Sequence, residues 1–153
     1  MANITTTVAE LPALEATALG SSGWIEITQQ RIDTFADATD DHQYIHVDPE
    51  RAKDGPFGTT IAHGFLTLSL VVPLWGELLE ISDVGTRVNY GLDKVRFTSP
   101  VPAGSKVRLT AAIKTVTEVK GGYQVHIDGV IEIEGQERPA VVVEFIERNY
   151  AQS

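Results

Sequence analysis

The chain has 153 residues, of which 42% are hydrophobic. This is enough for one buried core but little for two, so we predict a single domain over residues 1–153. Acidic residues outnumber basic ones by 21 to 12, and the net charge of −9 repels phosphate backbones and anionic lipids. Nucleic acid and membrane are therefore excluded as expected partners. The absence of cysteine also excludes disulfides, a thiolate nucleophile and cysteine-ligated zinc.

The N-terminal segment shows no targeting signal. Residues 1–20 have neither the basic start nor the apolar run of a secretory signal, and the segment is too acidic for a transit peptide. We predict that it forms a loosely structured lead-in and that the protein is cytoplasmic. The longest apolar stretch, residues 61–75, contains a histidine, a glycine and a proline and is shorter than the roughly 20 residues that a bilayer requires. We predict a buried helix there.

The first half of the chain carries helical patterns. Residues 23–27 alternate like a short strand, and Thr28 can cap a helix that ends near Thr39. A polar segment follows this helix. It ends at Asp48 and Pro49, a pair typical of the N-cap and first residue of a short helix. The polar segment is therefore expected to connect two helices.

A long apolar helix and four strands are predicted for the rest of the chain. Thr59 or Thr60 can cap the helix, whose apolar side chains point in nearly every direction, so it must be enclosed on most sides. Four segments rich in Val, Ile and Thr are predicted strands: 87–98, 106–118, 123–134 and 139–148. Turn sequences of hairpin length separate them, which favours antiparallel pairing. The predicted class is α+β, with a curved antiparallel sheet wrapped around a long central helix.

The polar segment contains a candidate acid/base pair. Asp41 and His46 lie five residues apart where helical continuity is poor, so the chain can fold back and direct both groups at one point. An imidazole has a reference pKa of about 6.5 and, beside a carboxylate, can exchange protons with a bound water. The alternative is that these residues cap helices or face the solvent.

The start of the long helix is a second candidate site. The first amides of a helix have no intrahelical partner, and the helix dipole adds positive charge there, so a carbonyl oxygen that gains negative charge would be stabilised. Gly64 has no side chain and would let a substrate approach the backbone closely. The alternative is that Gly64 only permits close packing of the helix against the sheet.

A metal site is a rival interpretation of the polar segment. His42 and His46 have the spacing of two ligands on one helical face, and Asp41 or Asp48 could add a carboxylate. The segment has no clear helical period and runs directly into the next helix cap, so the two imidazoles need not share a face. We therefore predict no metal ligands.

Three segments resemble one family. They are DHQYIHVDPERA at residues 41–52, TTIAHGFLTLSL at 59–70 and YGLDKVRFTSPVPAGSKV at 90–107. Together they resemble the MaoC-like dehydratases of the hotdog fold, in particular the (R)-specific enoyl-CoA hydratases and the NodN-like proteins. The resemblance covers most of residues 24–148 and implies a single hotdog domain.

The resemblance implies a reaction and a site. Asp41 and His46 match the catalytic positions of the family's hydratase pattern, whereas the Asn-Pro pair of that pattern is Gln43-Tyr44 here. The amide of Gly64 matches the group that polarises the thioester carbonyl. The implied activity is reversible addition of water to a trans-2-enoyl thioester, which gives an (R)-3-hydroxyacyl thioester.

The resemblance also bears on ligands and partners. It implies a substrate carried on coenzyme A or acyl carrier protein, no metal or redox cofactor, and a homodimer whose pocket is completed across two subunits. Two other functions stay open. Similar folds hydrolyse acyl-CoA as thioesterases, and a noncatalytic NodN-like protein would bind an acyl thioester without turnover. The replacement of Asn-Pro supports the second of these.

Overall fold

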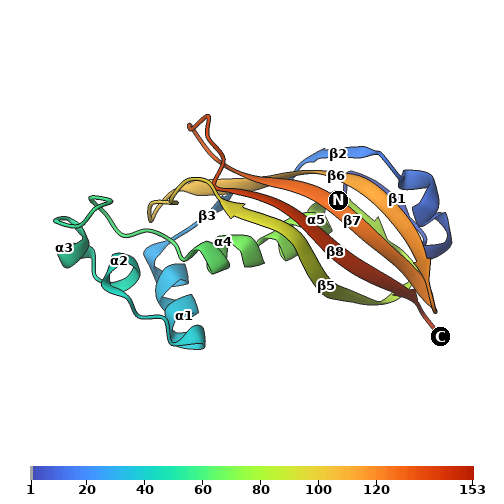
Figure 1. The fold of residues 1–153 in the computed structure, drawn as a ribbon, viewed down its shortest axis with the longest axis horizontal. Helices are drawn as coiled ribbons and strands as arrows, with labels where there is room; N and C mark the ends of the chain where they lie inside the picture. The colour runs from blue at the N-terminus through green and yellow to red at the C-terminus, as the bar shows by residue number, and fades with distance from the viewer. Residues whose placement is uncertain (1) are drawn as a thin grey trace.

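The computed structural model describes residues 2–153. A curved sheet covers a central helical segment, and α1, α2 and α3 lie at one end of the molecule (Figure 1). In chain order the elements are β1 (Ile4–Thr6), the 3-10 helix η1 (Val8–Leu14), β2 (Ala18–Ser21), β3 (Ile25–Glu26), α1 (Gln29–Thr39), α2 (Tyr44–Val47), α3 (Pro49–Ala52), α4 (Gly64–Ser69), α5 (Val71–Leu78), β4 (Leu79–Ile81), β5 (Val84–Phe97), β6 (Lys106–Val119), β7 (Gly122–Ile133) and β8 (Val141–Ala151).

The main sheet is antiparallel, with the strand order β2-β6-β7-β8-β5 and with β3 also pairing to β6. The four predicted strands are present as β5 to β8, so the α+β prediction is confirmed. β5 pairs with β8 rather than with β6, its neighbour in sequence. The segment between β5 and β6 is bonded elsewhere: the amide of Ala62 donates to Val101, and the amide of Thr98 donates to Ala140, each at 2.8 Å. These bonds direct the chain from one edge of the sheet to β6.

The central helix begins later than predicted. Its first helical residue is Gly64, so the predicted cap at Thr59 or Thr60 is wrong. The residues before it are extended because their amides bond other segments. The amide of Ile61, for example, donates to the carbonyl of Ile45 at 2.9 Å. Local apolar patterning cannot distinguish such a buried extended segment from the first turn of a helix.

The central helix is divided into α4 and α5 at Leu70. This residue keeps nearly helical angles (φ −70°, ψ −13°), and its amide bonds the carbonyls of Leu66 and Thr67. Pro73 has no amide to donate four residues back, so one intrahelical bond is missing just after the division. The helical face that packs in the core is apolar and buries Val71, Leu74, Trp75 and Leu78.

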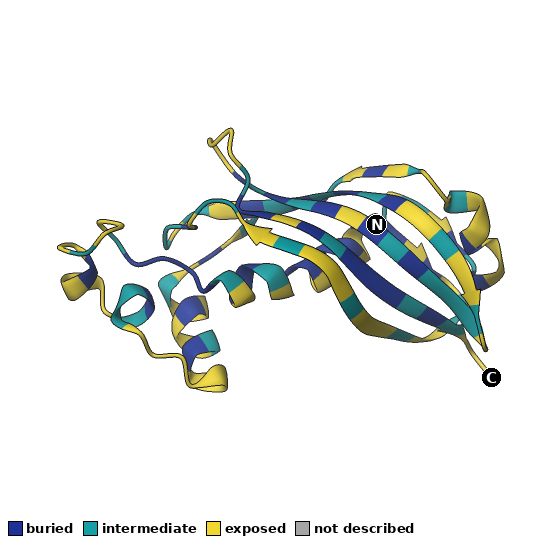
Figure 2. Cartoon of the chain, viewed as in Figure 1, coloured by how far each residue is buried: buried dark blue, intermediate teal, exposed yellow. Residues whose placement is uncertain are grey.

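The strands bury one face and expose the other. Along much of β6 and β7, buried residues alternate with residues of mostly intermediate exposure, as the period of two in a strand requires (Figure 2). The edge strand β5 differs, because most of its residues are exposed. Within residues 2–153, no helix combines the length and the apolar composition needed to cross a membrane.

The N-terminal segment is ordered, so the prediction of a loosely structured lead-in is wrong. β1 pairs with β4 in parallel, and η1 buries Val8 and Leu11 in the core. Thr7 and Glu10 form a capping box at the start of η1. Elements this short have little intrinsic stability, and tertiary contacts hold them in place. Their sequence therefore carries only a weak local signal.

Candidate functional site

The turn after α1 places the two predicted acid/base residues together. α1 ends at Thr39, and Asp40 adopts a left-handed conformation (φ 62°, ψ 22°) that turns the chain away from the helix. Asp41 lies in this turn, and His46 lies in α2. One carboxylate oxygen of Asp41 and one ring nitrogen from each of His46 and His63 lie within 4.8 Å of one another. Asp41 is exposed, whereas both imidazoles are buried.

The surroundings of His46 favour the neutral imidazole. Its side chain is buried, and Nδ1 lies 2.7 Å from the carbonyl oxygen of Ile61. A carbonyl only accepts, so Nδ1 carries the proton and Nε2 keeps the lone pair. Burial lowers the pKa of His46 below 6.5 and nearby His63 acts in the same direction, whereas the Ile61 bond and the Asp41 carboxylate oppose the shift.

Two residues outside the sequence prediction hold the main chain of His46. The side-chain amide of Gln29 donates to the carbonyl of His46 at 2.7 Å. The hydroxyl of Thr60 in turn donates to the side-chain oxygen of Gln29 at 2.6 Å. The start of α1 and the segment before α4 are thereby both connected to α2. No spacing in the sequence relates these three residues, which lie in different segments.

His63 also belongs to this site, although the sequence did not predict it as a site residue. It is the N-cap of α4 and only 3% exposed. Its Nε2 donates to the main-chain carbonyl of Asp41 at 2.9 Å. Its ring stacks on His46, with centroids 3.9 Å apart and planes inclined by 22°. The only available signal was its position next to Gly64.

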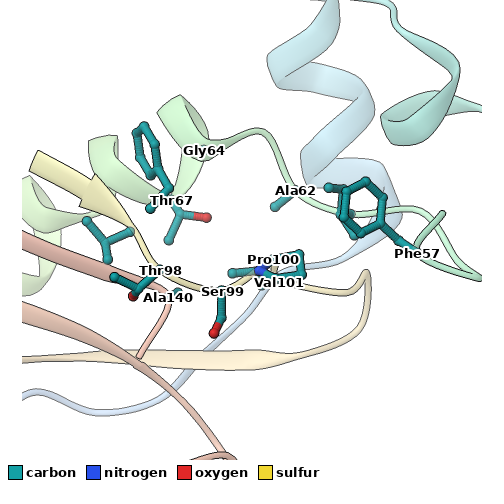
Figure 3. Close-up of a pocket in the computed structure, with 12 residues that line it drawn as sticks. Phe57, Ala62, Gly64, Thr67, Thr98, Ser99, Pro100, Val101 and Ala140 are labelled. Carbon is teal, nitrogen blue, oxygen red and sulfur yellow. The ribbon is translucent and has the colours of Figure 1, made fainter. Parts of the chain in front are cut away.

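Gly64 borders a cavity of about 330 Å³. As the first residue of α4, it has an amide without an intrahelical acceptor. No other acceptor within residues 2–153 bonds this amide. Thr67, one turn further along, also lines the cavity, and its buried hydroxyl has no protein partner among the described residues (Figure 3). The cavity has a mainly apolar lining, and Gly64 and Thr67 bring an unbonded amide and an unbonded hydroxyl to its border.

Gly64 also permits close packing of the helix against the sheet, which was the alternative interpretation of this residue. A Cβ atom added to Gly64 would lie 3.1 Å from the ring of Phe97. The glycine thus allows the aromatic ring from the end of β5 to lie directly against the helix start. Asp41 and His46 do not line this cavity, and His63 is the residue that connects them to Gly64.

The rival interpretation, a metal site that includes His42 and His46, is not assembled among the described residues. His42 bonds the exposed carboxylate of Asp37 at 3.0 Å and does not join His46. Asp41, His46 and His63 are close enough to share an ion, but the two rings stack nearly parallel. A single ion cannot lie near the plane of both stacked rings, as nitrogen coordination requires. The arrangement suits proton transfer better than metal binding.

A second polar cluster lies on the sheet. The Nδ1 atom of His126 lies 3.2 Å from Glu144 and 3.5 Å from Asp93, and Lys114 bonds Glu144 at 2.7 Å. The hydrogen bond from Lys114, with a smaller contribution from His126, lowers the pKa of Glu144 to about 2. The cluster joins β5, β6, β7 and β8 across the sheet and contains the ion pair between Lys114 and Glu144.

Comparisons with known proteins identify the family of the chain. Residues 12–135 match the MaoC like domain family. The chain is 49% identical over 145 residues to 3-hydroxyacyl-thioester dehydratase Z of Mycobacterium tuberculosis, covering 94% of this chain and 96% of that protein. It is 44% identical over 143 residues to nodulation protein N of Rhizobium leguminosarum bv. viciae, covering 91% and 88%.

The fold is similar to that of an R-hydratase from Pseudomonas aeruginosa. The TM-score is 0.75 at 19% identity, and the likeness covers 95% of this chain and 86% of that one. This similarity confirms the predicted hotdog fold. Because the matched residues span most of the sequence, the chain belongs to the MaoC-like domain family.

Proposed function

We propose that the protein is an (R)-specific hydratase that adds water reversibly to trans-2-enoyl thioesters and gives (R)-3-hydroxyacyl thioesters. The observation that carries the proposal is a buried His46, with its pKa lowered by burial, beside the Asp41 carboxylate and next to a helix start whose first amide has no acceptor within residues 2–153. Dehydratase chemistry on a thioester has further support from the 49% identity with a 3-hydroxyacyl-thioester dehydratase.

The reaction follows from the roles of three groups. The amide of Gly64 binds the thioester carbonyl oxygen, which makes C3 of the enoyl group electrophilic. Nε2 of His46 removes a proton from a water that Asp41 also holds, and the water oxygen forms a bond to C3. The π bond between C2 and C3 breaks, and C2 takes back a proton from the pair. No metal or redox cofactor is needed, because hydration changes no overall oxidation level and the amide takes the enolate charge.

The proposal is tested by the loss of enoyl-CoA absorbance. We expect the purified protein to hydrate crotonyl-CoA or a longer enoyl-CoA and to form the (R) product. Release of free coenzyme A without hydration would instead identify a thioesterase. Binding of enoyl-CoA without turnover would identify the NodN-like binding protein, the alternative favoured by Gln43-Tyr44 and by the 44% identity with nodulation protein N.

The exposed edge of the sheet supports a homodimer. β5 is a 14-residue edge strand, and unprotected edges of this length pair with other chains. Large apolar side chains are exposed on β5 and on the neighbouring helices: Phe65, Val72, Val88, Tyr90, Leu92 and Phe97. We propose that a second copy of the chain covers this edge and completes the pocket beside Gly64.

Sedimentation velocity tests the dimer. We expect a dimer at micromolar concentration, and Leu92→Lys should convert it to monomer because a charge would be buried at the contact. Thr117→Lys on β6 is the matched control, since it adds the same charge to an exposed position on another strand and should leave the dimer intact. A wild-type protein that sediments only as a monomer with full activity would contradict the proposal.

A further inference from the structure

We propose that His63 is a positioning residue for the Asp41 and His46 pair. It anchors the main chain of Asp41 to the start of α4 and supports the imidazole of His46. Its effect on turnover rests on the proposed function. Its effects on the geometry and titration of His46 do not, and they can be measured separately.

The first contact fixes Asp41. Asp41 lies in an exposed loop, where, among residues 2–153, its carboxylate accepts only a long hydrogen bond of 3.5 Å from the amide of Gln43. The hydrogen bond from Nε2 of His63 to the Asp41 carbonyl, at 2.9 Å, joins this loop to the helix cap. His63 is buried, and as the N-cap of α4 it is part of the packed fold. The bond therefore restrains the position of the exposed Asp41 loop relative to α4.

The second contact fixes His46. The two imidazoles stack at 3.9 Å, and Phe35 contacts the His63 ring at a centroid distance of 4.8 Å. The His63 ring therefore contacts both an aromatic side chain of α1 and the ring of His46. Together with the bond from His46 to Ile61, this stack restricts the direction in which Nε2 of His46 points.

The hydrogen bonds predict opposite tautomers for the two rings at a pH at which both are neutral. His46 donates from Nδ1 to the Ile61 carbonyl, and His63 donates from Nε2 to the Asp41 carbonyl. Nδ1 of His63 has no protein partner among the described residues, so only the Asp41 bond fixes its tautomer. The two buried rings carry their protons on different nitrogens, an arrangement that nuclear magnetic resonance can detect.

The stack also has an electrostatic consequence. The groups that act on the charge of His46 are Asp41 from the loop and His63 from the helix start, besides the Ile61 carbonyl. A positive charge on one imidazole opposes protonation of the other. His63 thus helps to keep His46 in the neutral form that a base requires, and replacement of His63 by an uncharged residue should raise the pKa of His46.

Two substitutions separate the contacts. His63→Gln keeps a donor near the position of Nε2 and loses the ring, whereas His63→Phe keeps an aromatic ring and loses the donor. We expect His63→Phe to lower kcat for crotonyl-CoA by on the order of 10²-fold, the usual effect of a misplaced catalytic group, with little change in KM. His63→Gln should recover most of this loss. Circular dichroism and Tm establish that both variants are folded.

A second measurement does not depend on activity. In ¹⁵N spectra above pH 8, His63 should carry its proton on Nε2 and His46 on Nδ1. His46 should titrate below 6.5 in the wild type and at higher pH in both variants. Equal turnover by His63→Phe and the wild type, equal losses in the two variants, or a His63 proton on Nδ1 would each overturn the proposal. A wild type without hydratase activity would refute the proposed function alone, and the tautomer and titration results would still decide the role of His63.

Discussion

Replacement of Asp41 or His46 by asparagine is expected to lower the turnover of crotonyl-CoA by on the order of 10²-fold or more. Both substitutions remove a group that exchanges a proton with water. His46→Asn keeps an amide donor that can reach the Ile61 carbonyl, so it removes the Nε2 base with little change in packing. If both residues hold the same water, the double variant should lose little beyond the worse single variant. Steady-state hydration kinetics of the three variants provide the measurement.

His42→Asn is the matched control for these variants. His42 lies next to Asp41 in sequence, but its exposed ring bonds Asp37 and lies outside the cluster of Asp41, His46 and His63. The control should therefore retain nearly normal turnover. Near-normal turnover by Asp41→Asn or His46→Asn, in a protein shown to be folded by circular dichroism, would remove that residue from the mechanism.

Substitution of Gly64 is expected to separate the role of its amide from the role of its small size. Gly64→Pro removes the amide donor, and we expect turnover to fall by about 10²- to 10³-fold, the usual effect of losing one oxyanion donor. Proline suits this position, because Gly64 is the first helical residue. The preceding His63 has φ −58° and ψ 136°, within the region that a residue before proline prefers.

Gly64→Ala is the control for the added side chain. Its Cβ meets the Phe97 ring at 3.1 Å, as the Cβ of proline would, but the amide is retained. We expect it to raise KM by crowding the thioester, with a smaller effect on kcat. The measurement is hydration of crotonyl-CoA by both folded variants. Wild-type turnover by Gly64→Pro would show that the carbonyl is polarised elsewhere, and the role assigned to this helix would be withdrawn.

Much of the fold was predictable because its signals are local. Runs of β-branched residues predicted the four long strands, and turn residues predicted their antiparallel direction. The partner of β5 was not predictable. Adjacent strands often form hairpins, but β5 pairs with β8 because the segment between β5 and β6 bonds Ala62 and the residue before β8. The short elements of residues 4–21 were also missed, because contacts with the core stabilise them more than their own sequence does.

The sequence by itself determined that Asp41 and His46 lie close together, because only one turn and part of one short helix, both specified by local residues, separate them. It also determined the family, through three motifs distributed over most of the chain. Only the tertiary structure decided what surrounds the pair. His63 reaches Asp41 across 22 residues, and Gln29 reaches His46 across 17. Such contacts depend on how α1, α2 and the start of α4 pack together, and no periodicity or spacing along the chain encodes that packing.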